Sequence, residues 1–279
     1  MEQIERKRRM RIRKRKRIIR RMVILVYRCI CVGVMAAIMI LVVKLLPEIV
    51  SIVGDDKLFE ENFVSAAREE NLQEEYPQSL LELLERNPET KDFVLNYPTN
   101  KNTDFEIDLS DELTDGTIPL FLQWDVRWGY ETYGSDFMAI TGCGPVCLSM
   151  VRCGLSGDDE WNPLEVANMS EDYGFYVEGA GTSWDLMTTG AIQLGLTVNS
   201  VIYDEAHIIA ELEKGNPIIC IMGPGDFTTS GHFIVLTGVD ENSQIKVCDP
   251  NSRINSEKSW EAKKLIPQIR NLWSYTYSN

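Results

Sequence analysis

The stretch GCGPVCLSMV at residues 142–151 decides the fold, because it predicts a buried helix that begins at a cysteine. Pro145 fits a first helical turn, where its missing N–H costs no hydrogen bond, and Gly154 fits the position just beyond a last turn. The residues between them are mostly apolar, which is typical of a helix packed inside a domain. We therefore expect a buried helix from Cys143 to about Cys153.

The position of Cys143 at a helix start has chemical consequences. A thiol there meets unpaired backbone N–H groups and the positive end of the helix dipole, and both favour the thiolate. The flanking glycines, Gly142 and Gly144, would let a substrate backbone approach closely. From composition alone, Cys143 is better interpreted as a small buried core residue like the other cysteines. The rest of the chain changes that interpretation.

The sequence contains two histidines, so a histidine base is one of them. His207 lies in an amphipathic segment at 204–215 that ends in a glycine, which is typical of a structural position on a helix. His232 opens HFIVLTG at 232–238, a buried-strand pattern preceded by the glycine-rich loop at 223–226. We therefore favour His232.

A predicted hairpin brings Asp249 next to this histidine. If the turn centres between Asp240 and Glu241, the strand at 244–249 pairs His232 with Asp249. Directly opposed Cβ atoms lie about 4.5–5.5 Å apart, so the carboxylate can bond an imidazole N–H and fix the tautomer. A one-residue slip would separate the pair, and the Asp-Pro dipeptide is also typical of a plain turn.

Four ordered motifs resemble the papain-like cysteine peptidases related to the bacteriocin-leader, or double-glycine, peptidases. The motifs are QWDVRWG at 123–129, GCGP at 142–145, GHFIVLTG at 231–238 and CDP at 248–250. The resemblance covers roughly residue 118 to the C-terminus. It implies an α+β papain-like fold, in which a helical part with the nucleophile helix packs on an antiparallel sheet.

The resemblance also implies catalytic roles. Cys143 would be the nucleophile, His232 the base that later protonates the leaving amine, Asp249 the orienter of the histidine, and Gln123 the oxyanion donor. A neutral amide suits the last role because it offers two N–H groups without titrating. Cysteine, histidine and carboxylate together form a nucleophile, base and orienter set.

The same motifs give the substrate-binding residues that we expect, which are Gly142, Gly144, Gly231 and Trp124. Tryptophans at 124 and 128 are nevertheless more often core or loop-packing residues than substrate platforms.

Residues 22–43 predict a transmembrane anchor. These 22 residues contain one charge, and at about 1.5 Å per residue they span roughly 33 Å, which matches a bilayer core. The basic cluster at 6–21 predicts a cytoplasmic N-terminus beside anionic lipid headgroups and an extracytoplasmic remainder. A cleaved signal peptide is the rival interpretation, but Ala36 and Ala37 run straight into further apolar residues. A nucleic-acid patch explains the basic run less simply.

The predicted organisation has four parts. Residues 1–21 form a basic cytoplasmic tail, 22–43 the anchor, 44–117 an acidic helical stalk and linker, and 118–279 the peptidase domain.

Two helices are expected within the stalk. The first starts at Ser79, whose side chain would cap it, and stops before Pro88. The second covers 89–95, with Phe93 and Val94 turned inward, before Tyr97-Pro98 breaks it. Their apolar residues imply packing onto the domain that follows, whereas 99–117 is expected to be a linker.

Composition and charge limit the remaining alternatives. An apolar fraction of 44% with 25% charged residues excludes a polytopic membrane protein, a collagen and a wholly disordered chain. The net charge is −14, but residues from 45 onward sum to −26. This acidity is either a solvated surface or a field that attracts cationic peptides. The cysteine spacings fit no common zinc site, so we expect no metal or cofactor. The cysteines at 147, 153, 220 and 248 form either disulfides or buried free thiols.

We therefore expect a membrane-tethered, extracytoplasmic cysteine peptidase that cleaves a peptide-type amide through a thioacyl-enzyme. The alternative is a catalytically inactive module of the same fold that binds peptide or cell wall. The leader peptidases of this family are commonly fused to a transporter, but here there is one predicted span and no phosphate-binding loop. The resemblance therefore leaves the substrate open.

Overall fold

A computed structural model of the chain describes residues 76–114, 116–179 and 181–278. The predicted basic tail, the predicted anchor and the first part of the predicted stalk lie outside these residues. Within the part that is described, no helix has both the length and the apolar character to cross a bilayer. The described residues all belong to one compact unit of the chain, Phe63–Asn279.

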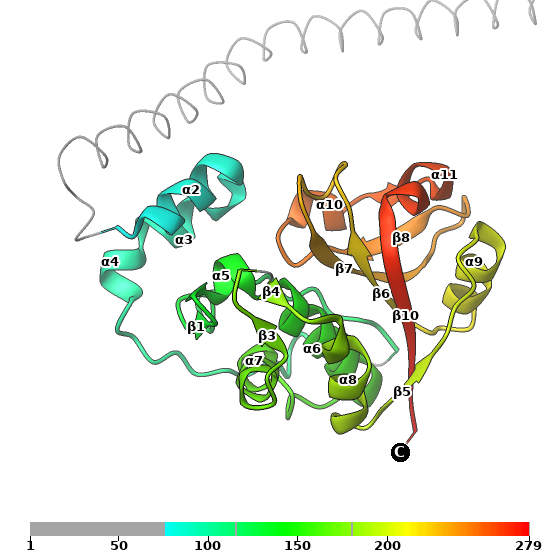
Figure 1. Cartoon of the computed structure of the whole chain (residues 1–279), viewed down its shortest axis with the longest axis horizontal. Coiled ribbons are helices and arrows are strands. Elements are labelled where there is room, and N and C mark those ends of the chain that lie inside the picture. The colour runs from blue at the N-terminus through cyan, green and yellow to red at the C-terminus, as the bar shows by residue number, and fades with distance from the viewer. Residues whose placement is uncertain (1–75, 115, 180, 279) are drawn as a thin grey trace, which may run out of the picture. The chain divides into compact units, whose positions relative to one another are not determined.

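The centre of this unit is a six-stranded sheet in the order β5-β10-β6-β7-β8-β9, in which every neighbouring pair is antiparallel (Figure 1). The strands of this sheet are β5 (Leu196–Asn199), β6 (Ile218–Met222), β7 (His232–Val239), β8 (Ile245–Cys248), β9 (Ser259–Trp260) and β10 (Ile269–Tyr277). Two short hairpins lie outside it, formed by β1 (Thr132–Tyr133) with β2 (Asp136–Phe137) and by β3 (Tyr176–Val177) with β4 (Gly181–Thr182).

Helices surround the sheet. The α-helices are α2 (Gln78–Arg86), α3 (Lys91–Leu95), α4 (Tyr97–Asn100), α5 (Met138–Thr141), α6 (Cys143–Ser156), α7 (Pro163–Asp172), α8 (Thr189–Gln193), α9 (Glu205–Glu213), α10 (Arg253–Ser256) and α11 (Ala262–Leu265). The described residues also form three short 3₁₀ helices, namely η2 (Pro88–Thr90), η3 (Trp184–Met187) and η4 (Ile266–Gln268).

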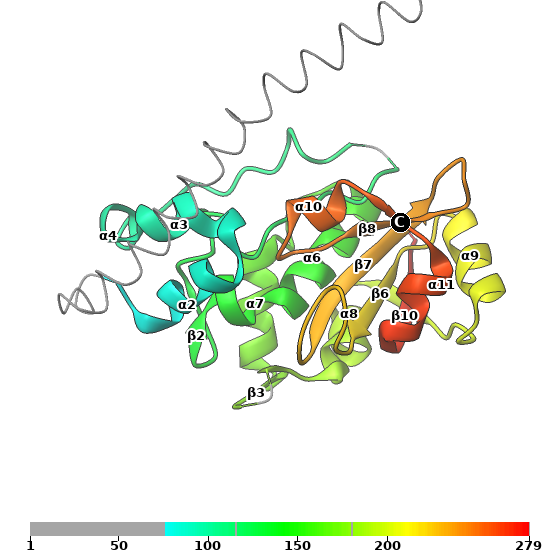
Figure 2. The same ribbon diagram turned by 90° about the horizontal axis from the view of Figure 1, so that it is seen from above.

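The sheet separates two cores because its side chains alternate between faces. On β6 and β7, one face packs with α6 through Ile219, Ile221, Phe233 and Val235. The other face packs with α9 and α11 through Ile218, Cys220, Ile234 and Leu236. Figure 2 shows α6 and α7 on one side of β6 and β7, and α9 and α11 on the other. The mixed helix and sheet architecture that we predicted is therefore present.

Helix α6 begins at Cys143, as predicted, but it runs one turn longer than expected. Gly157, with φ of 76°, is the left-handed residue that ends it. Gly154 instead lies inside the helix, where a Cβ atom would come 2.8 Å from the side chain of Ile118. A glycine at this position thus signals close packing rather than a helix end.

The predicted helices of the stalk are present, with two corrections. Ser79 does not cap α2, because its hydroxyl donates to Asp136 of β2 at 2.9 Å. Helix α3 ends at Leu95, before Tyr97-Pro98, as predicted, but a further helix, α4, begins at Tyr97, because proline is tolerated in a first helical turn. Helix α2 ends before Pro88 as predicted, and Phe93 and Val94 are buried as predicted.

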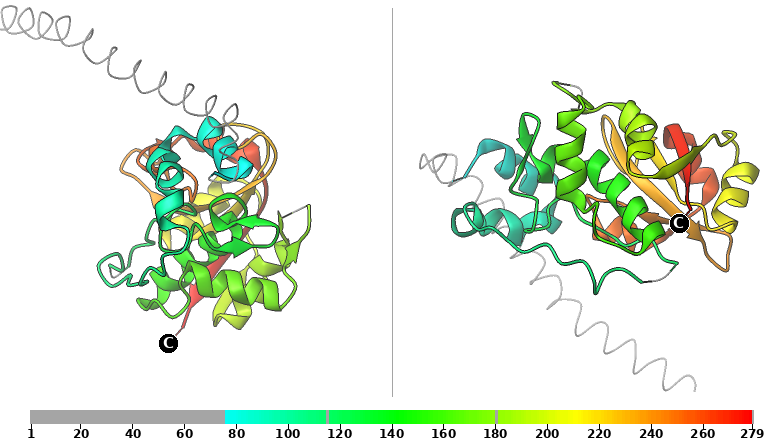
Figure 3. Two further views of the ribbon diagram at one scale, coloured as in Figure 1. Left: turned by 90° about the vertical axis from the view of Figure 1, so that its left-hand side faces the viewer. Right: turned by 90° about the horizontal axis from the view of Figure 1, so that it is seen from below.

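These N-terminal helices pack against the rest of the unit. Leu80, Leu81 and Leu84 are buried in one cluster with Ala139 of α5. In both views of Figure 3 the cyan segment lies against the green helical part. The expected linker has no helix or strand in its described part beyond residue 100, but Leu109 is fully buried in the main core. The segment is therefore anchored to the core at Leu109, with Ile107 and Leu113 packed partly buried beside it.

The predicted register of the β7–β8 hairpin is wrong. Gly238 pairs with Lys246 and Val239 with Ile245, which centres the turn on Asn242 instead of between Asp240 and Glu241. The physical reason is a longer turn, in which the Asp240 N–H donates to the Gln244 carbonyl at 2.8 Å. Asp249 consequently lies beyond the last residue of β8.

A β-bulge in the β7–β8 pair places the side chains of His232 and Asp249 on the same face of the sheet. Between Leu236 and Gly238 the register shifts by one, so that Val235 pairs with Cys248. Without that shift, strand alternation would place His232 and Asp249 on opposite faces. With it they share a face as diagonal rather than directly opposed neighbours.

Candidate active site

Cys143 is the first residue of α6 and is partly buried. The glycines on both sides of it are explained by packing. A Cβ atom at Gly142 would lie 2.5 Å from the Met138 carbonyl oxygen, and one at Gly144 would lie 2.6 Å from the Thr182 hydroxyl oxygen. These two glycines therefore allow α6 to start where it does.

His232 and Asp249 are hydrogen-bonded to each other. The His232 Nε2 atom lies 2.7 Å from Asp249 Oδ1, and both side chains are almost completely buried. An ionised carboxylate only accepts hydrogen bonds, so Nε2 carries the proton and Nδ1 is the nitrogen left for the thiol.

The Asp249 carboxylate is itself held by the loop that follows β8. Its Oδ1 accepts from the Asn251 N–H at 2.9 Å, and its Oδ2 accepts from Asn255 Nδ2 at 2.9 Å. The Ser256 hydroxyl accepts from the Asp249 N–H at 2.9 Å. Two residues in and around α10 thus hold the carboxylate that orients the histidine, and a third holds the Asp249 backbone.

The thiol and the imidazole are electrostatically coupled. Burial raises the pKa of the Cys143 thiol, but the hydrogen bond and charge of His232, with the N–H groups of Phe233 and Gly144, lower this pKa below its usual value. Burial lowers the pKa of His232, but the charge and hydrogen bond of Asp249, with Cys143, raise this pKa above its usual value. Both shifts favour a thiolate beside an imidazolium.

The other described cysteines behave in the opposite way. Burial raises the pKa of the thiols at positions 147, 153, 220 and 248. All five described cysteines, Cys143 included, are free thiols. Within the part of the chain that the structure describes, Cys143 is thus the cysteine set apart by a lowered pKa.

Gln123 is buried close to the thiol. Its Nε2 donates to the Ala139 carbonyl at 2.6 Å, and its backbone N–H donates to the Pro250 carbonyl at 2.7 Å. Its Oε1 is buried and has no hydrogen-bond partner among the described residues. The amide therefore keeps one N–H group for a bound molecule.

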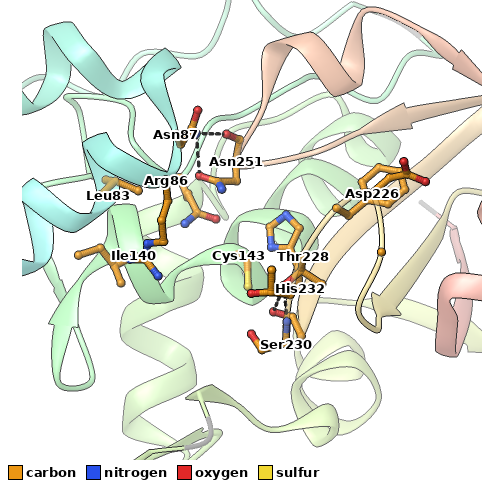
Figure 4. A pocket seen from close by; sticks show the side chains of 15 residues that line it. Leu83, Arg86, Asn87, Ile140, Cys143, Asp226, Thr228, Ser230, His232 and Asn251 are labelled. Atoms are coloured by element: carbon orange, nitrogen blue, oxygen red, sulfur yellow. Dashed lines mark hydrogen bonds between the residues drawn. The ribbon is translucent and has the colours of Figure 1, made fainter. Parts of the chain in front are cut away.

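These residues meet in a cleft with a volume of about 470 Å³. Figure 4 shows the Cys143 side chain beside His232, with α2 across the cleft. The lining residues are Leu83, Arg86, Asn87, Gln123, Ile140, Cys143, residues 225–230, Gly231, His232 and Asn251. Of the residues predicted from the sequence, the cleft thus contains Gln123, Cys143, Gly231 and His232.

Asp249, Gly142, Gly144 and Trp124 do not line the cleft. Asp249 lies behind His232, and Trp124 packs against the loop after β8, where its Nε1 donates to the Asn251 carbonyl at 3.2 Å. Trp128 is fully buried and belongs to the core. The two tryptophans thus pack within the fold.

Sequence reasoning missed the part of the cleft formed by α2. Leu83, Arg86 and Asn87 lie far outside the four motifs. The sequence of an amphipathic helix does not show whether an exposed arginine on it lines a cleft. It also missed Asn251 and Asn255. Asn251 had a signal, because the Asp-Pro dipeptide predicts a turn and Asn251 lies within it, where the Ser252 N–H donates to the Asp249 carbonyl at 3.1 Å. Asn255 had none.

The chain was also compared with known families, curated proteins and solved structures. The family model described as "Peptidase_C39 like family" matches residues 117–278. No curated protein matches the chain. Among solved structures, the peptidase domain of Streptococcus ComA, a bi-functional ABC transporter involved in a quorum sensing pathway, is similar to this chain. It has 17% sequence identity and a TM-score of 0.37, and the match covers 50% of this chain and 93% of that domain.

Proposed function

The chain belongs to the Peptidase_C39-like family, and from this membership we propose that it is a cysteine peptidase that uses Cys143, His232 and Asp249. The observation that carries the proposal is the bonded and coupled set at the cleft. A buried carboxylate holds the imidazole at 2.7 Å, and the imidazole in turn lowers the pKa of a thiol at a helix start. No other described cysteine combines these features.

The reaction follows from the positions of these groups. The Cys143 thiolate attacks the carbonyl carbon of the scissile amide, and the negative charge moves to the carbonyl oxygen. That oxygen would lie near the start of α6 and the free N–H of Gln123, which stabilise it. The His232 imidazolium gives its proton to the leaving amine, and a thioester remains on Cys143.

In deacylation the same groups act again, but His232 now accepts a proton instead of donating one. The neutral imidazole of His232 takes a proton from water, and the resulting hydroxide attacks the thioester carbon. The carboxylic acid leaves and the proton on His232 restores the ion pair. Asp249 stabilises the imidazolium without taking its proton.

The test is cleavage by the full chain in cells. Peptides released by cells with the wild-type chain are compared with those from Cys143→Ser and from Cys153→Ser, a matched change at a thiol with a raised pKa. We expect a set of peptides that disappears in Cys143→Ser and persists in Cys153→Ser. The same peptides in all three strains would support the alternative, a module that binds peptide or cell wall without cleaving it.

We also propose that residues 22–43 anchor the chain, with residues 1–21 in the cytoplasm and the peptidase outside. This proposal rests on the apolar run and the basic cluster of the sequence. We expect the intact chain in the membrane fraction, with its C-terminal part digested by protease added to cells without a wall. A mature protein that begins after residue 37 would instead indicate a cleaved signal peptide.

A further inference from the structure

The end of α2 forms one wall of the cleft, although α2 lies outside the family match at 117–278. Asn87 ties this wall to the loop after β8, because its Nδ2 donates to the Asn251 carbonyl at 2.6 Å. Glu89 adds a second tie, since its carboxylate accepts from the Ser252 hydroxyl at 2.5 Å and from the Arg253 N–H at 2.8 Å. The wall therefore has a fixed position relative to Asp249 and His232.

Arg86 is the residue of this wall that carries a charge. Its Nε donates to the Glu82 carbonyl within α2 at 3.1 Å, which leaves the two terminal nitrogens of the guanidinium. Among the described residues, no carboxylate forms an ion pair with Arg86. In Figure 4 its side chain extends from α2 past Ile140 on the side where Cys143 lies.

The opposite wall supplies no free negative charge. Asp226 lines the cleft, but its carboxylate pairs with Lys264 at 3.0 Å and accepts from Gln268 at 2.8 Å. The other residues of that wall, at 227–231, are uncharged. Arg86 is therefore the arginine of the cleft that no described carboxylate pairs with, in a chain whose sequence from residue 45 onward is strongly acidic.

A guanidinium with two free nitrogens matches the geometry of a carboxylate, which it binds through two parallel hydrogen bonds. We propose that Arg86 is a specificity-determining residue that binds a carboxylate of the peptide substrate near the scissile bond. The carboxylate belongs to an Asp or Glu side chain or to the C-terminus of the peptide. This inference rests on the proposed function, because it assigns a substrate class to the same cleft.

The experiment uses the purified full chain and a mixed peptide library, prepared once with free C-termini and once with amidated C-termini. The variants are Arg86→Gln, Arg86→Glu and the matched control Lys101→Glu, which makes the same charge change on the same segment outside the cleft. We expect the wild type and the control to prefer acidic peptides. The measured preference is the ratio of kcat/KM for a Glu peptide to kcat/KM for the matching Gln peptide. We expect this ratio to fall about tenfold in Arg86→Gln, which is the effect of losing one hydrogen bond between charged groups near a surface.

Two arms distinguish the source of the carboxylate. A preference for Asp or Glu at one fixed distance from the scissile bond, kept after amidation, identifies a side chain. A preference lost on amidation identifies the C-terminus. In either case Arg86→Glu should reverse the preference, towards Lys or Arg at that position or towards amidated peptides.

A binding measurement separates this inference from the proposed function. The Cys143→Ser chain, with and without Arg86→Glu, is immobilised and the captured peptides are identified. Suppose that the captured peptides are acidic only when Arg86 is present, and that the wild type cleaves no peptide. This result would support the Arg86 site and contradict the proposed peptidase activity. Cleavage that requires Cys143 but ignores acidic residues and the C-terminus would overturn the Arg86 site alone.

Discussion

Three side chains from separate elements form the coupled set of the site, in which the carboxylate raises the pKa of the imidazole and the imidazole lowers the pKa of the thiol. Cys143 comes from the start of α6, His232 from the start of β7, and Asp249 from the loop after β8. The first two were recognisable from local motifs, because a helix start and a strand start have clear sequence signals. Their contact with Asp249 depended on a turn whose length the sequence did not reveal.

Replacing Asp249 by Asn tests how the charge acts on the histidine. Asn retains a hydrogen-bond acceptor for His232 Nε2 but removes the negative charge, which raises the pKa of His232. The folded pKa of His232 should therefore fall, and the imidazolium should be lost at lower pH. We expect the alkaline limb of kcat/KM to move to lower pH in Asp249→Asn. An unchanged alkaline limb would show that Asp249 does not set the protonation of His232.

At the scale of elements, α10 connects the N-terminal helices to the site. The Glu89 carboxylate accepts from the N–H groups of Arg253 and Ile254 at the start of α10, and Asn255 of the same helix bonds Asp249. Helix starts are stabilised by such acceptors by about 1 kcal/mol. Glu89 is thus a positioning residue, two bonded steps from the carboxylate.

Glu89→Ala should loosen this support. We expect the pKa of His232 to fall and the alkylation rate of Cys143 at pH 6.5 to fall severalfold, while Glu89→Gln, which keeps an acceptor, restores most of the rate. Glu82→Ala on the solvent side of α2 is the control. A purely structural role would be indicated if Glu89→Ala lowered the denaturation midpoint but left the pH profile of alkylation unchanged.

Gly154 tests the packing of α6. Alanine favours a helix interior by about 0.5–1 kcal/mol over glycine. Here, however, a Cβ atom would lie 2.9 Å from the Ile118 Cα atom and from Pro119. Overpacking of this kind costs about 1–3 kcal/mol, so we expect Gly154→Ala to lower the free energy of unfolding by about 1 kcal/mol.

Gly238→Ala is the matched control, because a Cβ atom there has no neighbour within 4 Å. Chemical denaturation of both variants gives the comparison. Equal stability of the two variants would show that Gly154 does not mark a close approach.

The hairpin shows where prediction at this scale failed. The alternation of apolar residues predicted β7 and β8, because a pattern of period two depends on neighbouring residues alone. The turn and the bulge depend on pairing between strands, so the sequence predicted the wrong register. His232 and Asp249 still share a face because the longer turn and the β-bulge together shift the β7–β8 register by an even number of residues from the predicted one.

For the whole molecule, the main departure concerns residues 76–100. The sequence predicted helices that pack on the following domain, and the buried face of α2 confirms the packing. Their contribution to the cleft was not predictable, because the position of an exposed side chain depends on how whole elements dock. The anchor at 22–43 and the attraction of cationic peptides by the acidic chain remain predictions.

The most direct test of the account is the rate at which Cys143 reacts with iodoacetamide as a function of pH, in the wild type and in His232→Ala. An ordinary thiol has a pKa of about 8.5, so only about 1% is thiolate at pH 6.5. We predict rapid, selective labelling of Cys143 in the wild type at pH 6.5 and a rate at least tenfold lower in His232→Ala. The same slow rate in both proteins, rising together near the pKa of a free thiol, would contradict the coupled thiolate and imidazolium.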